Sequence, residues 1–248
     1  MTETTGTLHH NGNTLAWAHL PGTGPTIVFL PGFKSDMEGS KATHLRDWAA
    51  GQGRAMLRLD YSGHGSSTGA FEDGTIGAWA NDARAIIEAL TTGPLLLVGS
   101  SMGGWIGLLL ARAMGSRIAA LVGIAAAPDF TETLLWEGLA EAERITLLSH
   151  GYIERPSIYG EKPYRFTRAL IEDGRKQSLL AAPIPVTCPV RLLQGQQDPD
   201  VPWPTALRIA EQLESTDVEI TLIKDGDHRL SRPQDLALLT RTVATLLA

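Results

Sequence analysis

The chain has 248 residues, of which 43% are hydrophobic and 19% are charged, and its formal net charge is −6. This length allows one large domain or two small ones, α/β folds of this size are commonly single domains, and the composition is ordinary for a globular enzyme. The acidic balance argues against a general nucleic-acid or anionic-membrane binder, and no apolar run approaches the ~18 residues that a membrane span requires.

The N-terminus and the cysteine content bear on the compartment. Residues 1–6 contain neither a basic region nor an apolar core, so we expect no signal peptide. The single cysteine, Cys188, excludes an internal disulfide, and its apolar neighbours favour packing over catalysis. These features predict a cytoplasmic protein.

The first half of the chain predicts a hairpin and then an alternation of strands and helices. Residues 7–10 and 14–20 flank Asn11-Gly12-Asn13, which is typical of a β-hairpin turn. Apolar runs then alternate with helical periodicity, in the order strand 26–30, helix 41–50, strand 56–60, helix 75–90, strand 95–98, helix 105–113 and strand 118–124. This order requires a parallel sheet with right-handed crossovers.

The pattern changes at about residues 129–182. There we expect a small helical lid inserted between two sheet strands, with helical segments over 132–148, 166–171 and 175–180. The alternation then resumes with strand 190–193, helix 204–213, strand 218–223 and helix 233–247. The sequence therefore predicts one α/β domain over residues 1–248, with a lid.

A nucleophile motif follows the apolar strand at 95–98. Residues 99–103 read Gly-Ser-Ser-Met-Gly and lead into a helix, which is the setting of a nucleophile elbow. The glycine spacing selects Ser101 over Ser100 as the nucleophile. A strand–helix turn that merely requires small residues is the alternative interpretation.

Two further strand-end loops supply partners for such a serine. The loop after 190–193 carries Asp198 and Asp200, and the loop after 218–223 carries His228. The resulting chain order Ser, Asp, His is that of a hydrolase triad, in which His228 transfers the proton and the acid orients its ring. The Gly-x-x-Asp spacing favours Asp198, with Asp200 as the alternative. The other histidines lie in a hairpin, a helix, the insertion or a glycine-rich turn (His64).

The oxyanion of an acyl-transfer reaction needs two N–H donors. Met102, at the start of the helix after the elbow, is expected to supply one. Pro31 has no N–H and Gly32 lies in the turn, so the backbone of Phe33 is expected to supply the other.

A lid above Ser101 predicts an apolar acyl pocket. Its walls are expected to come from large side chains of the lid and from two or three residues of the body: Met37, Met102, Trp105, Trp136, Leu139, Ile153, Tyr159, Tyr164 and Phe166. Packing of the lid onto the body explains part of this set. No metal-ligand spacing is present, and Gly63-x-Gly65 is too short for a dinucleotide fingerprint, so we expect no cofactor.

With these residues in place, the chain resembles the α/β-hydrolases from about residue 15 to its C-terminus. It is most similar to the subgroup of a mitochondrial palmitoyl-protein thioesterase that is also described as an acyl-glucuronide esterase. The resemblance is carried by residues 29–39, 60–63, 98–105, 183–186 and 215–218. It implies about eight sheet strands and a serine hydrolase with Ser101, Asp198 and His228 as its triad. Pro-Gly at residues 31–32, where many relatives have His-Gly, is a feature of this subgroup.

The expected substrate is a small-molecule or acylated-protein ester or thioester of an apolar acyl group. Two other functions stay open: a carbon–carbon bond hydrolase or perhydrolase with the same triad, and a non-catalytic receptor on a hydrolase fold. The sequence determines neither the leaving group nor whether the protein is a monomer or a dimer.

Overall fold

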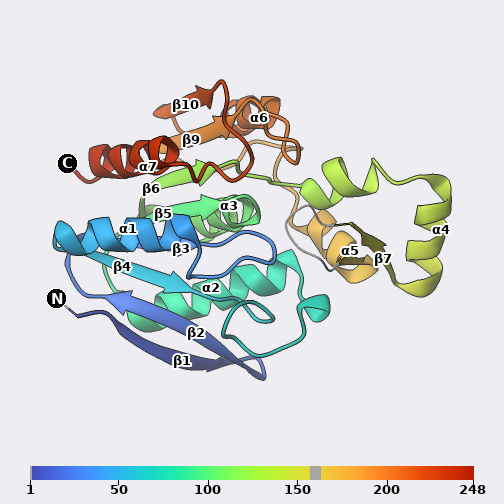
Figure 1. The fold of residues 1–248 in the computed structure, drawn as a ribbon, viewed down its shortest axis with the longest axis horizontal. Coiled ribbons are helices and arrows are strands. Elements are labelled where there is room, and N and C mark those ends of the chain that lie inside the picture. Colours follow the sequence, from blue (N-terminus) through green and yellow to red (C-terminus); the bar gives the residue numbers. More distant parts are fainter. Residues whose placement is uncertain (1, 157–162) are drawn as a thin grey trace.

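A twisted sheet of eight strands forms the centre of the protein (Figure 1). The computed structural model describes residues 2–156 and 163–248. The strand order is β1-β2-β4-β3-β5-β6-β9-β10, in which β2 pairs antiparallel with both of its neighbours, β1 and β4, and all other neighbouring strands pair in parallel. The strands are β1 (Thr4–His10), β2 (Asn13–Leu20), β3 (Thr23–Leu30), β4 (Arg54–Leu59), β5 (Leu95–Ser100), β6 (Ile118–Ile124), β9 (Val190–Gly195) and β10 (Val218–Ile223).

The apolar runs become buried strands because both faces of the sheet are covered. One face packs on α2 (Ile76–Leu90), α3 (Met102–Met114) and α6 (Pro204–Gln212), and the other on α1 (Ser40–Gly51) and α7 (Pro233–Leu246). Two hydrophobic cores result, one on each face. At the sheet's edge the hairpin turns at Asn11 and Gly12, whose φ angles of 47° and 80° are those an Asn-Gly turn supplies.

The insertion departs from the all-helical prediction. It contains a π-helical turn η3 (Thr131–Trp136), α4 (Glu141–His150), β7 (Tyr152–Arg155), β8 (Tyr164–Thr167) and α5 (Arg168–Lys176). The helix predicted over 132–148 is interrupted before α4, where Glu143 accepts a hydrogen bond from the N–H of Ala140. The helix predicted from Phe166 begins instead after β8. There Ile153 and Phe166 lie opposite each other in an antiparallel pair and bury their side chains together.

A buried aspartate closes the neck of the insertion. Asp129, near its start, accepts hydrogen bonds from the N–H groups of Leu179 and Leu180 and from the Ser178 hydroxyl, near its end. Two further contacts fix α5 and the turn after it to the body: Asp173 accepts from the N–H of Gly77, and Trp105 donates its indole N–H to the carbonyl of Gln177. The lid is therefore bound to the body at both ends.

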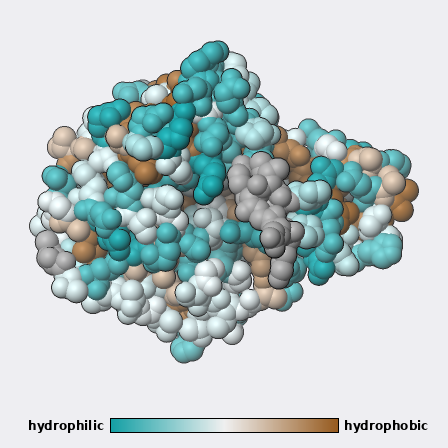
Figure 2. Space-filling model, in the orientation of Figure 1, coloured by the Kyte–Doolittle hydropathy of each residue, from teal (hydrophilic) through white to brown (hydrophobic). Residues whose placement is uncertain are grey.

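The face shown in Figure 2 is mostly hydrophilic, with hydrophobic side chains in small patches, one of them at the outer end of the lid near α4. Ile145 and Leu148 of α4 are 59% and 52% exposed. Two short 3₁₀ turns, η1 (Phe71–Asp73) and η2 (Gly115–Arg117), complete the elements. No helix among the described residues has the length and apolar character needed to cross a membrane.

Candidate active site

The turn between β5 and α3 has the strained geometry of a nucleophile elbow. Ser101 has φ 54° and ψ −117°, a conformation that few non-glycine residues adopt. The elbow requires glycines because other backbone lies against it. A Cβ at Gly99 would lie 2.2 Å from the carbonyl oxygen of Gly103, and one at Gly103 would lie 2.0 Å from that of Leu30. The motif's glycines are therefore dictated by close packing.

The fold brings Ser101, His228 and Asp198 into one hydrogen-bonded chain. The Ser101 Oγ lies 3.1 Å from Nε2 of His228, and Nδ1 of His228 lies 2.9 Å from Oδ2 of Asp198. The Asp198 side chain is fully buried, and that of His228 is 16% exposed. The alternative residues occupy other places: Ser100 ends β5, and Asp200 donates its backbone N–H to Asp198.

The loop after β3 lies directly against the elbow. A Cβ built on Gly32 would lie 3.4 Å from the Cβ of Ser101. Within the described part of the chain, the N–H groups of Phe33 and Met102 have no protein acceptor. Met102 is the first residue of α3, where N–H groups lack intrahelical partners and favour negative charge. The two predicted donors thus lie on the two backbone segments that meet at Ser101.

His64, which was predicted only to lie in a glycine-rich turn, holds the loop after β3 in place. Its Nε2 lies 3.3 Å from the N–H of Lys34, and its Nδ1 lies 3.2 Å from the carbonyl of Ser62. Burial lowers the pKa of His64 to about 4, so the ring is neutral at pH 7, donates from Nδ1 and accepts at Nε2. Tyr61 adds a hydrogen bond from its hydroxyl to the carbonyl of Pro31.

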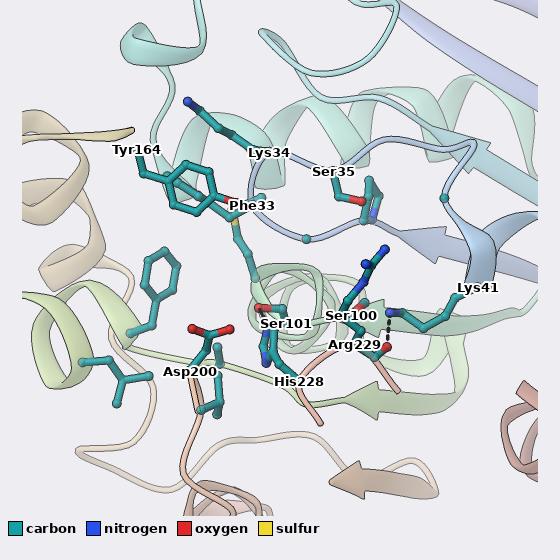
Figure 3. Close-up of a pocket in the computed structure, with 18 of the residues that line it drawn as sticks. Phe33, Lys34, Ser35, Lys41, Ser100, Ser101, Tyr164, Asp200, His228 and Arg229 are labelled. Atoms are coloured by element: carbon teal, nitrogen blue, oxygen red, sulfur yellow. Dashed lines mark hydrogen bonds between the residues drawn. The ribbon is translucent and has the colours of Figure 1, made fainter. Parts of the chain in front are cut away.

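A cavity of about 610 Å³ opens above Ser101 and has two different ends. In Figure 3, Phe33 and Tyr164 lie on one side of the serine, and Lys41 and Arg229 lie on the other. The first end is mostly apolar, lined by Phe33, Phe130, Leu134, Leu135, Tyr164 and Phe166. Charged side chains are also present in the wall: the Lys34 ammonium lies 5.1 Å from the centre of the Tyr164 ring, and Arg155 and Asp200 line the cavity as well. The Phe33 ring stacks on Phe166 at 5.4 Å, so the body and the lid share one aromatic cluster.

Five residues of the predicted substrate set do not line this cavity, because their side chains pack elsewhere. Met37 is buried against β2, and Trp105, a residue of α3, is buried in the hydrophobic core. Ile153 belongs to the lid's own core, and Trp136 packs against that core beneath the guanidinium groups of two arginines. Leu139 also lies in the lid core.

The other members of the set have different outcomes. Tyr164, Phe166 and Met102 line the cavity. Tyr159 lies outside the described residues.

Sequence reasoning missed Phe130, Leu134, Leu135 and the cations of the cavity wall. The apolar residues sit in and just before η3, whose position directly after β6 was the available signal, because β6 ends at the same sheet edge as the elbow. Arg229 could have been found as the neighbour of His228.

The opposite end of the cavity is cationic. Lys41 in the first turn of α1 and Arg229 beside His228 both line it. Burial and the Arg229 charge lower the pKa of Lys41 to about 8, against the opposing charges of Asp227 and Asp235. The Lys41 ammonium donates to the carbonyl of Arg229 and, at 3.4 Å, to the Ser231 hydroxyl. Across the residues that the structure describes, no carboxylate forms an ion pair with either cation.

One group of potential metal ligands occurs in the described ranges, formed by Asp198, Asp200 and His228. Their ligand atoms lie within 4.8 Å of one another. His228 and Asp198 already form a hydrogen bond in the serine–histidine–aspartate chain, and this bond accounts for their proximity without a metal.

Comparison with known proteins agrees with this geometry. Residues 27–237 match the family described as "Alpha/beta hydrolase family". The chain is 40% identical over 234 residues to the human mitochondrial palmitoyl-protein thioesterase ABHD10, covering 94% of this chain and 76% of that protein.

Two solved structures share nearly the whole fold. The alpha/beta hydrolase domain-containing protein 10 from mouse has a TM-score of 0.91 at 38% identity, covering 98% of both chains. A putative hydrolase from Agrobacterium vitis S4 has a TM-score of 0.94 at 41% identity, covering 100% of this chain and 99% of the other. The chain is therefore a serine hydrolase of ABHD10-like sequence and belongs to the α/β-hydrolase family.

Proposed function

We propose that this protein hydrolyses esters or thioesters of apolar acyl groups through an acyl-enzyme on Ser101. The observation that carries the proposal is the chain Ser101–His228–Asp198 at the floor of a cavity whose lid end is apolar. His228 Nε2 accepts the serine proton as Oγ attacks the acyl carbon. The same proton then passes to the leaving oxygen or sulfur, and water repeats the sequence to release the acid.

The backbone N–H groups of Phe33 and Met102 are assigned to the oxyanion. They are supported by two independent features: the absence of a protein acceptor for either group in the described chain, and the approach of Gly32 to Ser101. Donors fixed by backbone need no reorganisation when charge develops, which is the basis of their catalytic effect. Tyr61 and His64 keep the first donor in place through Pro31 and Lys34.

The acyl group is assigned to the lid end of the cavity. The human relative is named as a palmitoyl-protein thioesterase, which supports a long acyl chain and an acylated-protein substrate. A buried CH₂ contributes ~0.8 kcal/mol. We therefore expect kcat/KM to rise about three- to fourfold per added carbon until the apolar end is full. A series of acyl esters from two to sixteen carbons, assayed below their micelle concentrations, measures this slope.

A single change in the lid should reduce this selectivity. Leu134 lines the cavity, whereas Leu148 lies on the outer side of the lid and is 52% exposed. Leu134→Ser should lower kcat/KM for a decanoyl ester about tenfold, because one leucine's worth of apolar contact is lost, and leave acetyl ester hydrolysis nearly unchanged. Leu148→Ser is the matched control. If kcat/KM of the unmodified protein stays flat or falls as the acyl chain lengthens from acetyl, the result contradicts an apolar acyl site.

The cationic end favours one class of leaving group in particular, namely one that carries a carboxylate or a phosphate. His228 protonates the leaving atom, so the leaving group must lie beside its imidazole ring. Arg229 immediately follows His228 in the chain. Lys41 adds a second cation, and α1 begins at Ser40 with no acidic residue in its first turn. The resemblance to an acyl-glucuronide esterase implies a leaving group of this kind.

We expect Arg229→Gln to lower kcat/KM for an ester of an anionic sugar acid about tenfold, the usual effect of a lost charged hydrogen bond. The matched ester of the neutral sugar should change little. Lys41 is cationic below pH 8 and loses its charge above it, so the preference for the anionic ester should weaken above that pH. A thioester of a phosphorylated thiol, assayed in parallel, separates phosphate from carboxylate. Equal loss on neutral and anionic esters excludes an anion-binding end.

A further inference from the structure

We propose that Gln194 is a positioning residue for the triad acid and controls how strongly Asp198 holds the charge of the His228 ring. The proposal rests on the proposed function, because it concerns the same proton transfer. Gln194 lies near the end of β9 and is 1% exposed. Its Nε2 lies 3.0 Å from Oδ2 of Asp198, the same oxygen that faces Nδ1 of His228 at 2.9 Å.

The surroundings of the amide fix which of its atoms faces Asp198. Three oxygens lie around Nε2: Oδ2 of Asp198 at 3.0 Å, the carbonyl of Val201 at 3.1 Å and the carbonyl of Gly195 at 3.3 Å. An amide flipped by 180° would present its own oxygen to these three acceptors. The NH₂ group must therefore point to Asp198, and Gln194 donates.

With Gln194, the Asp198 carboxylate has the full set of donors that an ionised carboxylate accepts. Oδ1 accepts from the N–H groups of Asp200 at 2.9 Å and Val201 at 2.8 Å, and Oδ2 accepts from Gln194 and His228. Because the side chain is fully buried, no water replaces a missing donor without a rearrangement. Three of the four donors serve to fix the carboxylate, and Gln194 is the only side chain among these three.

Two consequences follow for the reaction. The amide fixes the direction of Oδ2, and so the orientation of the imidazole toward Ser101. It also offsets part of the carboxylate charge, because a hydrogen bond to an anion withdraws charge from it. Without the amide, Asp198 should attract the imidazolium more strongly, and His228 should keep its proton to a higher pH. The base form that activates Ser101 is then available over a narrower pH range.

The experiment is the pH dependence of kcat/KM for one acyl ester. Gln194→Met removes both N–H donors at nearly constant length, and Gln194→Leu is a second apolar variant in case one of them does not fold. The matched control is Gln197→Met, the same change at an exposed position of the loop that follows β9. A fluorophosphonate that labels the nucleophile counts active sites, so each rate refers to folded, competent protein.

We expect the acid limb to move up by about half a pH unit to one unit in the Gln194 variants, because a single amide donor offsets only part of the Asp198 charge. At the plateau, kcat per labelled site should fall about three- to tenfold with little change in KM. Gln197→Met should match the unmodified protein. The remaining charged groups around the ring stay the same in all variants: Asp200, Asp227, Arg229 and Lys41.

A purely structural role gives a different result. Gln194 variants with a lower melting temperature or fewer labelled sites, but an unchanged acid limb per site, would overturn this inference and leave the hydrolase proposal intact. An acid limb that moves down also overturns it. If the unmodified protein cleaves no ester or thioester, the proposed function fails first and this inference fails with it.

Discussion

Ser101→Ala should lower kcat for any ester or thioester by ~10³-fold or more, while the protein stays folded. The serine hydroxyl is the one nucleophile that lies 3.1 Å from the His228 base in the described structure. Alanine suits the elbow because the Cβ already present in serine is tolerated there, so backbone strain is unchanged. Turnover of an acyl thioester, together with circular dichroism, measures both parts of this expectation.

Ser100→Ala is the control for this substitution. Ser100 is the last residue of β5, is 8% exposed and makes no hydrogen bond to His228 among those found in the described chain. It should keep activity within a few-fold of the original and still react with a fluorophosphonate. Loss of labelling in Ser100→Ala, with labelling kept in Ser101→Ala, would overturn the assignment of Ser101 as the nucleophile.

Asp198→Asn should lower kcat about 10⁴-fold, as the corresponding change does in the serine protease triad. The geometry explains why the loss is large. Two backbone N–H groups hold Oδ1, so the new NH₂ must take the place of Oδ2 and face Nδ1 of His228. The ring then accepts at Nδ1 and carries its proton on Nε2. A protonated Nε2 has no lone pair with which to accept the Ser101 proton.

Asp200→Asn tests the alternative acid. Asp200 contributes its backbone N–H to Asp198, and asparagine retains that donor. Its kcat should therefore stay within about fivefold of the original, an effect no larger than that of one neutral hydrogen bond. Both kcat values come from steady-state assays at saturating concentrations of the same ester. A similar loss in the two variants leaves the acid unassigned, and a larger loss in Asp200→Asn overturns the assignment to Asp198.

Local sequence patterns were sufficient to predict the strands of the sheet, because strand formation here has local causes. Short apolar runs without alternation form strands buried on both faces, and β5 is enclosed along its whole length. The glycines around Ser101 follow from the space that the elbow leaves. Ser101, Asp198 and His228 could be predicted to meet for a different reason. Each follows a parallel strand, and such strands end at one edge of the sheet.

Local patterns were not sufficient for the insertion. Large apolar side chains there serve a lid core, the seam with the body and the cavity, and composition alone does not separate these roles. Trp136 and Ile153 pack in or against the lid core, whereas Leu134 and Phe166 reach the cavity. Their directions depend on the interruption before α4 and on the pairing of β7 with β8, which bring together residues distant in sequence.

The sequence by itself determined the strands and the elbow, because these depend on neighbours within a few residues. It also showed that Ser101, Asp198 and His228 each follow a predicted parallel strand, and such strands end at one edge of a sheet. Only the tertiary structure decided that Asp198 rather than Asp200 faces His228, since that choice rests on β9 lying beside β10. It alone placed Gln194 on Asp198 and His64 on the loop of Phe33. It also placed Lys41 and Arg229 across the cavity from the lid aromatics, because such contacts depend on the packing of distant elements.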